Sequence, residues 1–399
     1  MVILVLNSGS SSLKYKLYHM RTEEVVAVGL VERIGNTNGN AVISHQLNDA
    51  DKIRLEQKVN DHSEALQAVL QFLTAPEWGI LKSLDEIKAV GHRVLHGGEI
   101  FSKAIIVGEK ELKQIESLRE LGPLHMPANI MGIVACKKLM PNTPQIAVFD
   151  TAFHQTMPRS SFLYALPYEY YEKYQVRRYG FHGTSHRYVS KRAAEILKKD
   201  LSKLKMVTLH LGNGSSAAAI KDGKCFDTSM GFTPLEGFVM GTRCGDIDPA
   251  IVSFLQNTLS LNPNEVDNLM NKKSGFLGMT GLSDMRDIQK ARREGNERAQ
   301  DAYNIFIQRL VKYVGSYYAE LGGLDVLVFT AGIGENDHLI REDVCKQLSH
   351  LGVVFDLKKN DGLRGKEAII SKPRSKVKVM VVPTNEELLI ARDSYELVK

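Results

Sequence analysis

The chain has 399 residues, which is enough for two domains. Its apolar content of 43% is ordinary for a globular protein. The net charge is +5, from 51 basic and 46 acidic residues, and it does not indicate nucleic-acid binding, which needs clustered basic residues. The four cysteines lack CxxC spacing, which disfavours a zinc ribbon or a disulfide framework. The sequence has no signal-peptide pattern and no apolar run near the ~20 residues of a membrane span, so we expect a cytoplasmic protein that does not bind membranes.

The first third of the chain predicts several strands followed by mixed helices and strands. A helix is expected over DHSEALQAVLQFLTA, with Ser63 as its N-cap, because apolar residues recur there at helical spacing. A strand is expected within DEIKAVGHRVLHGG, and another ends at Asp150. The expected strands before the helix are MVILVLN, SLKYKLYHM, EEVVAVGLVERI and AVISHQL.

The pattern then restarts in the second part of the chain. MVTLHLGNGSSAAAIKDGKCFDTS predicts three strands, and Asp222-Gly223 is typical of a type I′ hairpin turn. Its turn LGNGSS repeats the earlier LNSGSS, which indicates a duplicated domain. A third glycine-rich turn is expected at AGIGEN after the strand LDVLVF, and the chain ends with a strand, Pro383 and a helix. The boundary between the halves is expected near residues 150–156.

The two similar turns are candidates for binding phosphate. Small residues after a strand let backbone N–H groups approach an anion, so Gly9 to Ser12 and Lys14 could hold phosphate oxygens. A P-loop is excluded because the sequence has no GxxxxGK[ST]. The stretch Gly212 to Ala217 resembles a dinucleotide fingerprint, but a hairpin follows it where that motif needs a helix. An NAD-linked dehydrogenase and a non-enzymatic nucleotide switch remain as alternatives.

Three further polar clusters lie at the expected ends of strands. Arg93, within GHRVLHGG, is either a surface ion pair or a bidentate clamp for a carboxylate or phosphate. His182 and His186 are spaced for a metal on a helix, but neither an HExxH pattern nor a nearby cysteine accompanies them. Arg243 lies among glycines and two aspartates in GTRCGDIDP, where a solvated loop is the plain alternative.

In combination these stretches resemble one family. VLNSGSSSLK, AVGHRVLHGG, RYGFHGTSH, HLGNGSS, MGTRCGDIDP, SDMRDI, AGIGEN and PTNEE are similar to the motifs of the acetokinase (acetate kinase) family, in the same order. The resemblance extends from residue 2 to about residue 395. It implies an α/β fold of two duplicated ribonuclease H-like (actin-like ATPase) domains flanking a nucleotide cleft. These domains would be residues 1–150, to which a C-terminal helix at about 385–399 returns, and residues 151–384.

The resemblance also implies an activity. It predicts a Mg²⁺-dependent (or Mn²⁺-dependent), reversible transfer of the ATP γ-phosphoryl group to acetate, which gives acetyl phosphate and ADP and serves acetyl-CoA biosynthesis. It further implies a homodimer. A propionate kinase or another short-chain carboxylate kinase of the same family is the alternative.

Roles for individual residues follow from positions that match the family's motifs. Asp150, His182, Arg243 and Arg93 are the implied catalytic residues, and Asn7 and Glu386 are the implied metal ligands. The implied substrate pocket consists of Arg93, Leu95, Leu124, Phe181 and Pro234. The implied nucleotide-binding residues are Lys14, His210, Leu211, Gly212, Asn213, Gly214, Asp284, Met285, Arg286, Gly332, Ile333, Gly334, Glu335 and Asn336.

Two of these roles can be examined chemically. Asp150 corresponds to the family's acid/base position, but a carboxylic acid substrate is already ionised near pH 7. We therefore predict that Asp150 orients Mg²⁺, Arg93 or the attacking oxygen. Leu95 stands where the family commonly has Val, so we expect a slightly smaller pocket that favours acetate over propionate.

Overall fold

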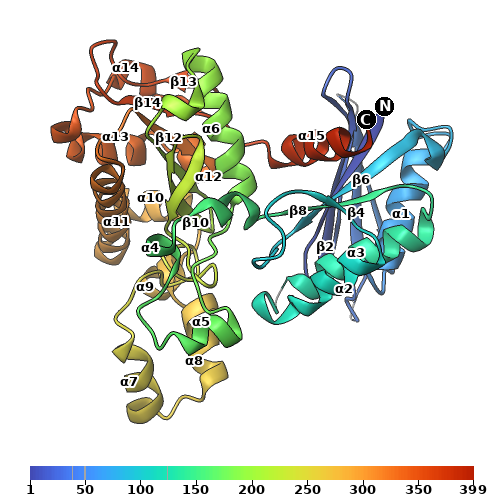
Figure 1. The fold of residues 1–399 in the computed structure, drawn as a ribbon, viewed down its shortest axis with the longest axis horizontal. Coiled ribbons are helices and arrows are strands. Elements are labelled where there is room, and N and C mark those ends of the chain that lie inside the picture. The colour runs from blue at the N-terminus through green and yellow to red at the C-terminus, as the bar shows by residue number, and fades with distance from the viewer. Residues whose placement is uncertain (38, 49–50, 124) are drawn as a thin grey trace. The chain divides into compact units, whose positions relative to one another are not determined.

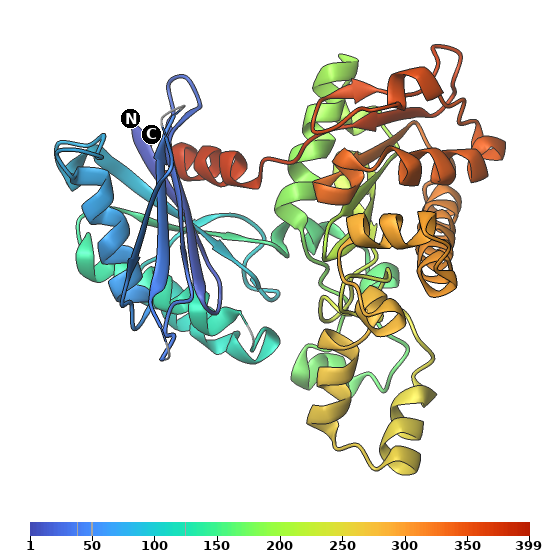
Figure 2. The same ribbon diagram turned by 180° about the vertical axis from the view of Figure 1, so that it is seen from behind.

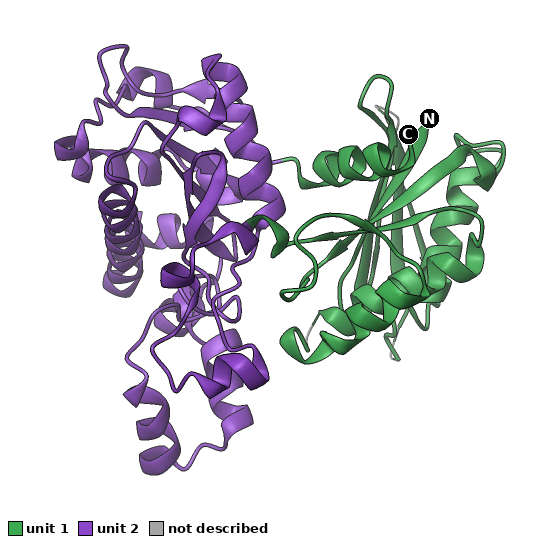
Figure 3. Ribbon diagram, in the orientation of Figure 1, with its two compact units in different colours: residues 1–153, 385–399 green, residues 154–384 purple. Residues whose placement is uncertain are grey.

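The computed structural model describes residues 1–37, 39–48, 51–123 and 125–399. The chain forms two compact units (Figure 3). Unit 1 comprises Met1–Phe153 together with Asn385–Lys399, and unit 2 comprises His154–Thr384. None of the helices in the described ranges combines the length and the apolarity that a bilayer crossing demands.

Unit 1 is built on one sheet with the strand order β5-β4-β3-β2-β1-β6-β8-β7. Strands β1 to β5 pair antiparallel with their neighbours in the chain, whereas β6 pairs parallel with β1 and with β8. The strands are β1 Val2–Ser8, β2 Ser12–His19, β3 Glu24–Glu32, β4 Ala41–Leu47, β5 Ile53–Gln57, β6 Ile87–Val94, β7 Ile105–Ile106 and β8 Gln145–Phe149.

Helices cover both faces of this sheet (Figures 1 and 2). On one face, α1 (His62–Thr74) packs against α3 (Met126–Leu139), and α2 (Glu109–Ser117) lies beside α3. On the other face, α15 (Glu386–Val398) contacts β1 and β6, so the last helix of the chain completes the first unit. Asp61, and not Ser63, caps α1: its carboxylate accepts the backbone N–H of Glu64, so the helix begins before the expected serine. Two short 3₁₀ turns, η1 Leu84–Glu86 and η2 Arg119–Leu121, complete the unit.

Unit 2 contains a sheet with the strand order β11-β10-β9-β12-β14-β13. Its first strand, β9, pairs antiparallel with β10 and parallel with β12, just as β1 pairs antiparallel with β2 and parallel with β6. The two sheets therefore share the pairing pattern that the repeated turn predicts. The strands are β9 Met206–Leu211, β10 Ser215–Lys221, β11 Lys224–Thr228, β12 Val326–Thr330, β13 Ala368–Ile369 and β14 Lys378–Val381.

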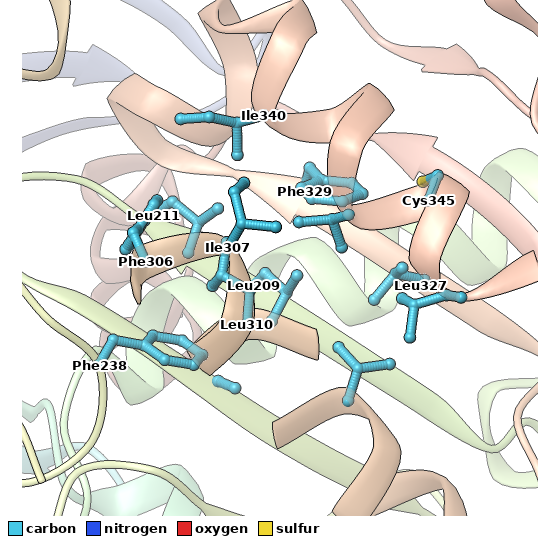
Figure 4. Close-up of a cluster of buried hydrophobic side chains, with 14 of the residues drawn as sticks. Leu209, Leu211, Phe238, Phe306, Ile307, Leu310, Leu327, Phe329, Ile340 and Cys345 are labelled. Atoms are coloured by element: carbon cyan, nitrogen blue, oxygen red, sulfur yellow. The ribbon is translucent and has the colours of Figure 1, made fainter. Parts of the chain in front are cut away.

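The core of unit 2 lies between this sheet and its longest helix. Leu209 and Phe329 of the sheet belong to the same buried cluster as Phe306 and Leu310 of α11 and Ile340 of α13 (Figure 4). The helices are α4 Arg159–Phe162, α5 Glu169–Tyr174, α6 Gly183–Leu197, α7 Ala250–Leu259, α8 Pro263–Lys272, α9 Gly275–Thr280, α10 Met285–Arg293, α11 Glu297–Leu321, α12 Ala331–Asn336, α13 His338–Gln347 and α14 Leu357–Asn360, with 3₁₀ turns η3 Ala152–Thr156, η4 Leu201–Lys203 and η5 Ser349–Leu351.

The turns of unit 2 decide two of the sequence-based predictions. Asp222 and Gly223 have φ angles of 53° and 72°, as a type I′ hairpin turn requires, and they connect β10 to β11. The glycine-rich turn after β9 leads into β10, so the helix that a dinucleotide fingerprint needs is not there. The expected turn at 331–336 was wrong, because these residues form the short helix α12 directly after β12.

Candidate active site

The polar candidates of unit 1 gather on the face of its sheet that α15 covers. Leu6 and Leu13 point into the core beneath α1, so by strand alternation their neighbours Asn7 and Lys14 point to the other face. Asn7 and Lys14 are paired across β1 and β2. On β6, a Cβ at Gly91 would lie 2.7 Å from Ile390 Cγ2 of α15, so Gly91 faces this helix. The sheet thus places several polar side chains beside the start of α15.

Arg93 and Asp150 form a close ion pair on this face. Arg93 Nη2 lies 2.7 Å from Asp150 Oδ2, and Nε lies 3.1 Å from both carboxylate oxygens. Asp150 is 1% exposed, and its backbone N–H donates to Val94 O just beyond β8. Asp150 raises the pKa of Arg93, and the effect outweighs the lowering by burial. The carboxylate therefore holds one edge of the guanidinium and keeps it charged.

Glu386 brings a second carboxylate toward this pair. It is the first residue of α15, which Asn385 caps by accepting the backbone N–H of Leu388. Its Oε2 lies 3.9 Å from Arg93 Nε. Burial raises the pKa of Glu386, the nearby charge of Asp150 raises it further, and Arg93 offsets part of the shift. Negative charge is therefore crowded beside Glu386.

A divalent cation would fit this surplus of negative charge. Within the described residues there is no cluster of three or more His, Cys, Asp or Glu that could hold a metal by itself. The oxygen ligands that this face offers include the amide oxygen of Asn7 and the carboxylate of Glu386. Mg²⁺ prefers such oxygen ligands and keeps several waters, so few protein ligands suffice.

A pocket of ≈ 210 Å³ lies along the same face of unit 1. Asn7, Lys14 and Lys16 line it together with Val5 and Glu387. Lys16 pairs with Glu387 at 3.3 Å, whereas Lys14 is exposed. The expected turn cradle between β1 and β2 is a tight loop in which Gly9 N–H donates to Ser12 O.

In unit 2, His182 and Arg243 converge on one glycine. His182 precedes α6, has a φ of 55° and stacks on His210 with ring centroids 4.1 Å apart. A Cβ at Gly214 would lie 3.6 Å from His182 Nε2 and 3.3 Å from Arg243 Nη1. Arg243 Nη1 donates to Pro234 O, and burial lowers the pKa of Arg243. A half-buried cation and an imidazole thus flank a bare stretch of backbone, which is an arrangement suited to phosphate oxygens.

A second pocket, of ≈ 830 Å³, lies entirely within unit 2. Several sequence-distant segments meet there: the turn after β9, the start of α10, helix α12 with the start of α13, and the loop that contains Arg364. The expected nucleotide residues that line it are Gly212, Asn213, Asp284, Met285, Arg286, Gly332, Ile333 and Asn336. Sequence reasoning missed the other lining residues, Ser283, Gln289, Arg293, Asp337, His338, Leu339 and Arg364. Arg364, between Gly362 and Gly365, was the one with a visible signal, a cation in a glycine-rich loop.

Other expected nucleotide residues are buried next to the segments that line this pocket. His210 and Leu211 are buried in β9, and Gly334 is buried in α12. The carboxylate of Glu335 is turned inward: Oε1 accepts the backbone N–H groups of Ala331 at 2.7 Å and Thr384 at 3.0 Å. Glu335 therefore fixes the left-handed residue at the start of α12 and the last residue of unit 2.

The remaining candidates are distributed as follows. Leu95 belongs to unit 1, where its side chain contacts Gly122, while Phe181 and Pro234 belong to unit 2. The side chain of Phe181 is 1% exposed. Leu124 lies outside the described residues.

One residue in each of two polar clusters has a structural role. His186 is buried and bonds to the hydroxyls of Thr208 and Ser216, which accounts for both ring nitrogens and overturns the metal interpretation of the histidine pair. Asp246 accepts hydrogen bonds from Tyr313 and from Gly237 N, so this aspartate anchors its loop.

The comparisons with known proteins identify the class and then the family. The crystal structure of Porphyromonas gingivalis acetate kinase superposes with a TM-score of 0.96, at 49% identity over 100% of both chains. The fold is thus the expected α/β fold of two actin-like ATPase domains, and the protein is a kinase that phosphorylates a carboxylate. The chain belongs to the acetokinase family, whose model matches residues 2–392.

Individual relatives agree with this assignment. The acetate kinase of Treponema denticola is 57% identical over 100% of both chains, and that of Clostridioides difficile is 56% identical over the same share. The crystal structure of a propionate kinase from Francisella tularensis is 42% identical with a TM-score of 0.92 over 99% of both chains.

Proposed function

We propose that this protein transfers the γ-phosphoryl group of ATP reversibly to acetate, giving acetyl phosphate and ADP. The observation that carries the proposal is the Arg93–Asp150 pair, in a chain whose full-length relatives include acetate kinases. Arg93 Nη1 has no hydrogen-bond partner among the residues that the structure describes, so one edge of its guanidinium is able to donate to a carboxylate of the substrate. The other edge is held by Asp150.

The chemistry asked of the residues is positioning and charge compensation. An ionised carboxylate oxygen of acetate attacks the γ-phosphorus, an O–P bond forms, and the bond between the γ-phosphorus and the β,γ-bridging oxygen breaks to release ADP. No proton moves in this step, because acetate is already ionised near neutral pH. Asp150 therefore acts by orienting Arg93 and not as an acid or base.

Positive groups of unit 2 would balance the charge of the transferring group. Arg243 and His182 flank Gly214 and can donate to oxygens of a phosphoryl group placed there. Lys14 and the residues that line the pocket of unit 2 would hold the rest of the nucleotide.

Asn7 and Glu386 are the residues that would hold Mg²⁺, or Mn²⁺ in its place. The bound ion would neutralise charge on the phosphate oxygens of ATP. The crowded negative charge beside Glu386 supports this assignment.

The substrate alternative is propionate, since one structural relative is a propionate kinase. We propose that Leu95 borders the methyl group of acetate and disfavours longer acids. We further propose that the protein is a homodimer, because the exposed aromatic residues of α5 and the exposed Phe254 of α7 leave apolar surface on unit 2. We also propose a cytoplasmic location, as the sequence analysis predicts.

The proposed reaction can be tested by trapping its product. The protein is incubated with Mg-ATP and, separately, each of the C1 to C5 carboxylates, and acyl phosphate is trapped as hydroxamate with hydroxylamine. We expect the highest kcat/KM with acetate and a lower value with propionate. The absence of hydroxamate with every acid would refute the proposal, and a preference for propionate would select the alternative.

A further inference from the structure

A chain of hydrogen bonds leads from the interior of unit 2 to His182. Thr208 Oγ1 lies 2.7 Å from His186 Nδ1, and His186 Nε2 lies 2.8 Å from Ser216 Oγ. Ser216 Oγ in turn lies 2.9 Å from His182 Nδ1. Thr208, His186 and Ser216 are all fully buried, on β9, α6 and β10. The chain therefore ends at the ring that faces Gly214 and Arg243.

The donors and acceptors of this chain are limited in number. Burial lowers the pKa of His186 well below its ordinary value, so its ring stays neutral with one N–H and one acceptor nitrogen. The Ser216 hydroxyl has a single proton and contacts two imidazole nitrogens, so it donates to one and accepts from the other. Only two arrangements of protons satisfy these three hydrogen bonds, and they run in opposite directions.

Thr208, at the buried end of this chain of hydrogen bonds, distinguishes the two directions. In one, Thr208 donates to His186 Nδ1, His186 Nε2–H donates to Ser216, and Ser216 donates to His182 Nδ1. In the other, His186 donates to Thr208, and the Thr208 hydroxyl proton needs a second acceptor, which no described residue provides. An unpaired buried donor is costly enough to favour the first direction by about tenfold or more.

We propose that Ser216 and His186 are positioning residues that hold the proton of His182 on Nε2, the nitrogen beside Gly214 and Arg243. This inference rests on the proposed function in one respect, namely that His182 faces the phosphoryl group. A neutral ring with Nε2–H can donate to a phosphate oxygen without first being protonated. The titratable groups near the two rings include Arg243 beside His182, His210 stacked on His182 and 6.2 Å from His186, and His154 at 5.8 Å from His186.

The proton positions can be measured directly in the intact protein. Imidazole ¹⁵N NMR of the histidine-labelled enzyme distinguishes the two tautomers, and a His182→Gln variant assigns the His182 signals. We expect His182 to be protonated on Nε2, with Nδ1 shifted as a hydrogen-bond acceptor. Protonation of neutral His182 on Nδ1 would overturn the inference.

A Ser216→Ala variant removes the link between the two rings. We expect its His182 Nδ1 resonance to move to that of an acceptor without a hydrogen bond, and kcat to fall by about tenfold or more because the ring loses its fixed orientation. KM for acetate and ATP should stay within about twofold, since neither substrate loses a contact. An unchanged Nδ1 resonance would overturn the inference.

The matched control is Ser190→Ala on α6, which also deletes a fully buried hydroxyl, but one whose single hydrogen bond within the described ranges is to Arg187 O. It should leave the His182 signals and kcat unchanged. The wild-type spectrum decides the case even if Ser216→Ala does not fold. An inactive wild-type enzyme whose spectrum shows Nε2–H would refute the proposed function and not the proton position.

Discussion

At the scale of single residues, the most consequential feature is that the carboxylate of Asp150 is already paired with Arg93. Its two oxygens receive the Nε and Nη2 donors of Arg93, and its side chain is almost completely buried. A carboxylate held in this way is suited to orienting a cation and poorly placed to exchange protons with a substrate.

The substitution Asp150→Asn separates orientation from proton transfer. It removes the charge that fixes Arg93, so we expect the KM for acetate to rise by about tenfold and kcat to fall, with both limbs of the pH profile retained. Steady-state kinetics across pH measure this. If the KM for acetate and the magnesium affinity are unchanged while the high-pH limb of the pH profile is lost, Asp150 instead transfers a proton. Asp85→Asn, at an exposed site of unit 1, is the control.

The substitution Leu95→Ala tests the size of the acyl pocket. Removing the side chain should raise kcat/KM for propionate and butyrate relative to acetate by about tenfold, because small differences in hydrophobic fit are worth this much. The ratio is measured with the same panel of acids. If it does not change, Leu95 does not line the pocket.

At the scale of elements, the nucleotide pocket depends on how α12 is held. Arg341 of α13 is fully buried and donates to Gly334 O, to Leu363 O and to Asn360 Oδ1, each at 2.8 Å. Burial lowers the pKa of Arg341 to about 10, which leaves it charged at neutral pH. One guanidinium therefore ties α12 and α14 to α13.

The substitution Arg341→Met should loosen this assembly. It leaves buried acceptors without donors, and we expect a loss of about 3 kcal/mol in the free energy of unfolding and a weaker affinity for ATP. Urea unfolding and calorimetric titration with ATP measure the two effects. Lys346→Met on the same helix removes an exposed lysine that pairs with the half-buried Glu342, and it should cost less than about 1 kcal/mol. Equal losses in the two variants would contradict this role.

At the scale of the whole molecule, buried neutral histidines make stability depend on pH. Burial lowers the pKa of His92 to about 4, against an ordinary value near 6.5. Below pH 6.5 the unfolded chain binds a proton that the folded chain does not, so stability falls as the pH falls from 6.5 to 4. His186 acts in the same direction.

The substitution His92→Gln should remove part of this dependence. It keeps a donor for Gln145, so we expect stability at pH 7 to change little and the loss between pH 7 and 5 to shrink by about 2 kcal/mol. The single tryptophan, Trp78, lies in unit 1 with His92 and reports urea unfolding by fluorescence. His350→Gln, at an exposed site, should keep the wild-type slope. If stability depends on pH as steeply in His92→Gln as in the wild type, the account is contradicted.

The sequence predicts the local features of this molecule better than its long-range ones. The repeated turns, the Asp222-Gly223 hairpin and the strands beside them follow from residue type and alternation. The helical state of residues 331–336 does not, because Glu335 also binds the backbone N–H of Thr384, which is distant in the chain. Arg341 likewise ties this glycine-rich segment to Asn360 and Leu363. Arg293 and Arg364 reach the nucleotide pocket for the same reason: the fold alone brings their segments together.

The central claim is that a carboxylate oxygen of acetate attacks the γ-phosphorus of ATP. Phosphorus-31 NMR of the product made from acetate labelled with ¹⁸O in both carboxyl oxygens tests it most directly. We predict acetyl phosphate with one ¹⁸O in the bridge between carbon and phosphorus, visible as an isotope shift of the phosphorus signal. Acetyl phosphate without label in that bridge, or no acetyl phosphate at all, would contradict the account.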